Sequence, residues 1–107
     1  MMYSAKRKSL IEAVYSLAAG NGDARSRLVQ AYLKFHVLTT DSFPDELKAD
    51  WNWVILRITQ KGPLKDNQYN NNTLGSVQNT MNGIKNKTAS KIASKIIDIF
   101  FALKNNH

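Results

Sequence analysis

The chain has 107 residues, of which 43% are hydrophobic, and it contains no cysteine. This length and apolar content suit a single compact domain with one core. The lack of cysteine excludes a disulfide framework and a thiolate metal site and is usual in a reducing compartment, so we expect a cytoplasmic protein. Fifteen Lys and Arg against eight Asp and Glu give a net charge of +7, which favours acidic or polyanionic partners.

Neither of two apolar stretches predicts a signal peptide or a membrane span. The stretch after Lys8 is interrupted by Glu12 and Ser16, so it reads as an amphipathic helix rather than a secretory h-region. The longest apolar run, from Ile96 to Leu103, contains Asp98 and is far shorter than the roughly 20 residues that span a bilayer. We therefore expect no membrane partner.

The first two helices are predicted as an antiparallel hairpin. Residues 4–19 carry Leu10, Val14 and Leu17 at helical spacing, with Ile11 beside them. Asp23, after a short glycine-containing link, is a good N-cap for a second helix that reaches about Leu38. The inner face of this second helix is expected to hold Leu28, Ala31, Tyr32 and Phe35.

The third predicted helix has apolar side chains on two opposite sides. It should begin with Pro44 at its first position and end near Gln60. At about 100° per residue, one arc holds Leu47, Trp51, Val54, Ile55 and Ile58, and the opposite arc holds Ala49, Trp53 and Leu56. One arc must pack inward, so the other needs a neighbouring element or a partner.

The C-terminal part of the chain predicts a loop and two more helices. Residues 62–73 read as an exposed connector in which Tyr69 is a candidate contact residue. Thr73 is expected to cap a short fourth helix, and Thr88 to cap the last one. The last helix should bury Ala89, Ile92, Ala93, Ile96, Phe100 and Leu103. Phe101 lies outside this arc and is expected to be exposed.

These patterns contain no strand, so the sequence predicts an all-α fold: one domain over residues 1–107, a bundle of about five short helices. Catalytic chemistry is not indicated. Of the two histidines, His107 is terminal and His36 sits on the edge of an apolar face. No HxxxH or ExxH spacing and no glycine-rich phosphate loop occurs. We expect no enzyme activity, cofactor, bound metal or small-molecule substrate.

Residues 83–93 read Gly-Ile-Lys-Asn-Lys-Thr-Ala-Ser-Lys-Ile-Ala. This segment resembles the turn and recognition helix of helix-turn-helix DNA-binding proteins, in which a glycine and an apolar residue form the turn. Gly83 and Ile84 match that turn, and Thr88, Ser90 and Lys91 match the start of the recognition helix. The preceding helix departs from the family pattern, because Gln78 and Asn79 stand where an apolar residue and an alanine are usual.

Two functional hypotheses follow. The first is a non-catalytic binding module that contacts another protein or a second copy of itself, and its interface residues are Trp53, Leu56, Tyr69 and Phe101. The alternative is a nucleic-acid-binding protein that uses the basic C-terminal segment. Its contact residues would be Lys85, Lys87, Thr88, Ser90, Lys91 and Lys95.

Overall fold

The structure is a computed structural model that describes residues 4–61 and 72–106. Its helices are α1 (Ser4–Ala19), α2 (Ala24–Phe35), α3 (Asp45–Ile58), α4 (Asn72–Gly83) and α5 (Asn86–Asn106), with a short 3-10 helix, η1 (Thr40–Ser42), before α3. Within these residues there is no strand, so the expected all-α fold is confirmed. Among the described helices, none is both long and apolar enough to cross a membrane.

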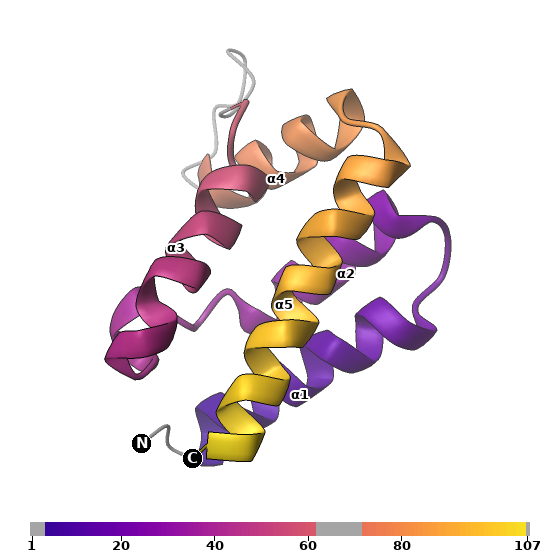
Figure 1. Ribbon diagram of the computed structural model, residues 1–107. Coiled ribbons are helices and arrows are strands. Elements are labelled where there is room, and N and C mark those ends of the chain that lie inside the picture. Colours follow the sequence, from indigo (N-terminus) through magenta and orange to yellow (C-terminus); the bar gives the residue numbers. More distant parts are fainter. Residues whose placement is uncertain (1–3, 62–71, 107) are drawn as a thin grey trace.

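The hairpin of α1 and α2 forms as the sequence predicts (Figure 1). Gly22 has a φ of +85°, a left-handed conformation that favours glycine. The next residue, Asp23, caps α2, because its carboxylate accepts a hydrogen bond from the Ser26 amide at 3.0 Å. The glycine reverses the chain and the aspartate restarts the helix.

Helix α5 is the longest element and contacts three other helices, α1, α2 and α3 (Figure 1). Helix α4 closes one end of the bundle, where it contacts α2 and α3. The helices share one hydrophobic core, to which α5 contributes Ala89, Ile92, Ile96, Ile99 and Leu103. Burial of this face leaves the opposite side of α5 toward solvent.

An aromatic cluster holds α3 in place. Trp51 is fully buried, and its ring centroid lies 5.0 Å from that of Phe35 in α2 and 4.5 Å from that of Phe43. Phe43 follows η1, which turns this ring inward between α2 and α3. Within the described part of the chain, the buried Trp51 Nε1 has no hydrogen-bond partner.

The ends of α2 and α3 differ from the predicted ones. Helix α2 ends at Phe35, and Leu38 lies beyond the helix although it is buried. Pro44 is the N-cap of α3 with extended backbone, not its first helical residue. The helix stops at Ile58, because the next residue, Thr59, leaves the helical region of φ and ψ while its hydroxyl donates to the Ile55 carbonyl at 2.7 Å.

The predictions of two helix caps and of part of the core face of α5 are also wrong. Thr73 and Thr88 lie inside α4 and α5, which begin at Asn72 and Asn86. The buried arc of α5 includes Ile99, whereas Phe100 and Ala93 are only half-buried. The buried face of α5 is therefore centred nearer to Ile99 than the sequence predicts.

Replacing Trp51 tests the aromatic cluster. We expect Trp51→Ala to lower the free energy of unfolding by about 3–5 kcal/mol, because it leaves a large cavity. Trp51→Phe removes the unpartnered N–H and much less volume, so it should cost no more than about 1.5 kcal/mol. Urea denaturation followed by circular dichroism measures both values, and equal losses for the two variants would contradict this account.

Candidate interaction site on helix α5

The structure places the predicted protein-interface residues on two helices. Leu56 in α3 is 61% exposed and Phe101 in α5 is 51% exposed, which confirms the expected exposure of Phe101. Trp53 is half-buried and packs against the hydrophobic core from the edge. Tyr69 lies outside the described residues. The fully buried tryptophan is therefore Trp51, and Trp53 presents only part of its ring.

Trp53 lines a groove between α3 and α5 with a volume of about 760 Å³. The lining residues are Ala49, Asp50, Trp53, Lys87, Ser90, Lys91, Ser94, Lys95 and Asp98. Three of the lining side chains, those of Ala49, Ser90 and Ser94, are small and leave space that larger ones would fill. A smaller hollow of about 170 Å³ touches the same indole and is lined by Arg57, Thr88 and Ile92 among others.

Charge is distributed unevenly along this groove. Lys95 and Asp50 form an ion pair across it at 3.2 Å. The guanidinium of Arg57 lies 5.4 Å from the centre of the Trp53 ring, a cation–π arrangement. Among the described residues, neither Lys87 nor Lys91 has an ion-pair partner. The groove is thus positive toward the start of α5.

The residues predicted to contact nucleic acid gather at the start of α5. Five of them are exposed: Lys85, Lys87, Thr88, Ser90 and Lys91. The sixth, Lys95, is half-buried and forms an ion pair with Asp50 of α3 at 3.2 Å.

The connection between α4 and α5 consists of Ile84 and Lys85 only. Arg25 of α2 donates a hydrogen bond to the Ile84 carbonyl at 3.4 Å, which ties this turn to the bundle. In α4 the buried side chains are those of Ser76, Val77, Thr80 and Met81, while Gln78 is exposed. The turn is short and anchored, and α4 packs through residues that the helix-turn-helix pattern does not use.

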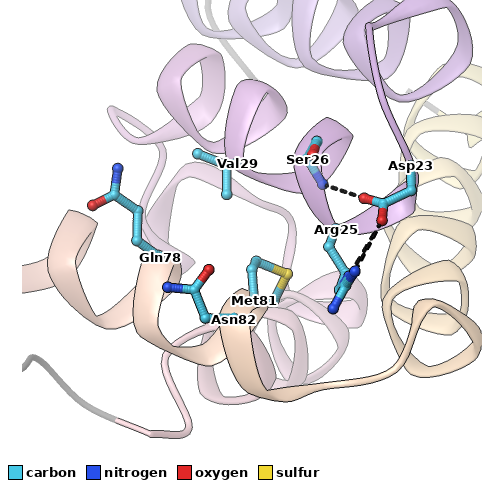
Figure 2. A pocket seen from close by; sticks show the side chains of 7 residues that line it. All are labelled: Asp23, Arg25, Ser26, Val29, Gln78, Met81 and Asn82. Carbon is cyan, nitrogen blue, oxygen red and sulfur yellow. Dashed lines mark hydrogen bonds and ion pairs between the residues drawn. The ribbon is translucent and has the colours of Figure 1, made fainter.

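A second groove, of about 560 Å³, lies between α2 and α4 (Figure 2). Its charged groups bind one another: the Asp23 carboxylate accepts from the Ser26 amide and forms an ion pair with Arg25 at 3.1 Å. The hydrogen bond from Ser26 and those from the side chains of Arg25 and Asn86 lower the pKa of Asp23 to about 2. Because Asn86 begins α5, this cluster joins the starts of α2 and α5, and its charges are already satisfied.

Two pairs of exposed apolar side chains on the hairpin were not predicted from the sequence. Ile11 and Tyr15 of α1 are exposed, as are Leu33 of α2 and Val37, which follows that helix. Ile11 was expected beside the core stripe, but α2 and α5 cover the other side of α1. The members of each pair, Ile11 with Tyr15 and Leu33 with Val37, are four residues apart and lie outside the core arc of the predicted helix. This spacing in the sequence could have predicted that both pairs are exposed.

Within the described residues, no group of three or more His, Cys, Asp or Glu could hold a metal ion. Comparison of the chain with protein-family models, with curated proteins and with solved structures finds no match.

The pH dependence of stability tests the hydrogen-bonded cluster around Asp23. Its pKa is lowered from the ordinary 3.8, so the charged carboxylate stabilises the folded state above about pH 4, and this contribution is lost as the pH falls toward 2. Asp23→Asn keeps a capping oxygen but does not titrate. We expect the difference in Tm between wild type and Asp23→Asn to shrink as the pH falls through this window.

The matched control for this measurement is Glu12→Gln on the exposed side of α1. Its Tm difference from wild type should change less over the same pH range. A wild-type advantage over Asp23→Asn that is as large at about pH 2 as at neutral pH would contradict the role assigned to the charged carboxylate.

Proposed function

We propose that this protein is a non-catalytic binding module that acts through protein contacts made by the exposed side of α5. The observation that carries the proposal is the placement of an exposed apolar side chain and a groove lined by Trp53 on one side of this helix. Phe101 is half-exposed there, and the groove begins one turn earlier, at Asp98.

Aromatic side chains that are partly open to solvent are the usual anchors of protein interfaces. Phe101 is supported by its neighbour Phe100, whose ring centroid lies 5.5 Å away, so a contact at this position orders little additional chain. Trp53 is likewise held by Arg57. Leu56 adds an exposed apolar side chain on α3, although it does not line the groove.

Site-specific photo-crosslinking tests this function in cells that naturally express the chain. A benzophenone amino acid would replace Phe101, Ser94 or Leu56 in turn, and Gln78 on α4 serves as an exposed control. We expect protein adducts at Phe101 and Ser94, because a partner seated on α5 covers both positions. Peptide mass spectrometry identifies the adduct. Adducts equally frequent at Gln78, or none at all, would contradict the proposal.

A second candidate function is nucleic-acid binding by the start of α5. The observation that favours it is the exposure of Lys85, Lys87 and Lys91 together with two hydroxyl side chains, those of Thr88 and Ser90, around the short turn after α4. Lysines at this spacing provide phosphate contacts, which give affinity without sequence readout.

Salt dependence tests this second function. We expect the double variant Lys87→Ala/Lys91→Ala to weaken binding to a mixed-sequence duplex at low salt. The slope of log K against log salt should become shallower by about 2, because each lysine that neutralises a phosphate accounts for about 1. The charge-matched control Lys8→Ala/Lys34→Ala changes exposed lysines of α1 and α2. Equal effects of both pairs would indicate a nonspecific charge effect, and no binding at low salt would exclude this function.

A further inference from the structure

One exposed stripe runs along α5 with alternating spacings of four and three residues, the spacing of a helix face that packs against another helix. Its members are Lys87, Lys91, Ser94, Asp98, Phe101 and Asn105, all of them exposed. The buried residues of α5 lie on the opposite side of the helix. The stripe is therefore a continuous surface that no described element of the fold covers.

The two ends of this stripe differ in shape. Toward the C-terminal end, Phe101 projects from the helix. Toward the N-terminal end, the stripe borders the groove, which is lined by Trp53 and by the small side chains of Ser90 and Ser94. Phe101 lies ten residues after Lys91, about 15 Å along the helix. A protruding ring and a groove that can receive one thus lie on the same face of one helix.

The two ends also differ in charge. Lys87 and Lys91 line the N-terminal part of the groove, and Asp98 lies at its C-terminal limit, close in sequence to Phe101. Among the described residues, none of these three has an ion-pair partner. Ser94, between the two ends, has a small side chain that lets another helix approach closely.

We propose that the partner of this face is a second copy of the chain, bound with its α5 antiparallel about a two-fold axis near Ser94. Two-fold symmetry makes such an interface self-complementary, so each contact occurs twice. Phe101 of one copy then enters the groove of the other, beside Trp53. This inference rests on the proposed protein-contact function and names its partner.

Charge complementarity selects this orientation. The antiparallel arrangement places the Asp98 carboxylate of each copy against the Lys91 end of the other. A parallel arrangement would instead set Lys87 and Lys91 against the same lysines. Because each copy carries a net charge of +7, two copies repel at long range, and contacts that pair opposite charges reduce this repulsion.

Charge reversal tests the arrangement directly by multi-angle light scattering and analytical ultracentrifugation. We expect wild type to dimerise, and Lys91→Glu or Asp98→Lys alone to raise the dimer Kd at least tenfold, since each sets like charges against each other. An equimolar mixture of these two variants should form a heterodimer, because every contact in it pairs opposite charges. The double variant Lys91→Glu/Asp98→Lys should dimerise again.

Lys34→Glu makes the same charge change on α2 and should leave the dimer Kd unchanged, and circular dichroism checks that each variant folds. A wild-type chain that stays monomeric up to about 1 mM would overturn the inference, since weaker association is not specific. The inference would also be overturned if the equimolar mixture of Lys91→Glu and Asp98→Lys associated no more strongly than either variant alone. A dimer that Ile11→Glu dissociates and Lys91→Glu does not would overturn it as well.

The crosslinking experiment separates this inference from the proposed function. An adduct of Phe101 with a second copy supports both. An adduct with a different protein, together with a monomeric chain in solution, overturns the second-copy inference and leaves the protein-contact function in place. Absence of any protein adduct at Phe101 and Ser94 overturns the protein-contact function itself.

Discussion

The burial of Trp51 is the constraint on which the surface of this protein depends. Its ring is enclosed by Phe35 and Phe43, and this contact fixes the rotation of α3 about its own axis. Trp53 follows two residues later, about 200° around the helix, so it cannot share the same interior. Its side chain instead lines the groove between α3 and α5. The site is thus a geometric consequence of packing the first tryptophan.

Helix α5 is held at both flanks and near its start, which gives its exposed face a defined position. The Lys95–Asp50 ion pair links it to α3, and Asp23 with Arg25 links its start and the preceding turn to α2. Exposed ion pairs contribute little stability individually, so the buried face of α5 supplies most of the energy. The polar contacts orient the helix, and this orientation brings Trp53 beside Lys87 and Lys91.

Helical periodicity and local capping chemistry predicted much of the fold. The Asp23 cap, the hairpin and the opposite placement of the two tryptophans all follow from residues close in sequence. The errors arise where a distant element decides the outcome. Thr88 matches a cap, but α5 begins two residues earlier, and Ile99 is buried where the sequence predicted Phe100. The exposure of Leu56 and Phe101 and the partial exposure of Trp53 were predictable, since these residues fall outside the core arcs. The groove was not, because it depends on small side chains of two helices that meet only in the folded chain.

The two proposed functions use the same surface of α5, so one molecule cannot carry out both at the same time. Lys87 and Lys91 would contact phosphates in one and the acidic end of a second copy in the other. A major groove is about 12 Å wide and admits one helix, whereas α3 lies directly alongside α5 and would have to be accommodated as well. Only the first turns of α5 could therefore enter the major groove of DNA, whereas a helical protein partner can contact the full exposed length of α5. A protein contact engages Phe101 and the Trp53 groove as well as the lysines, so these features favour it over nucleic-acid binding.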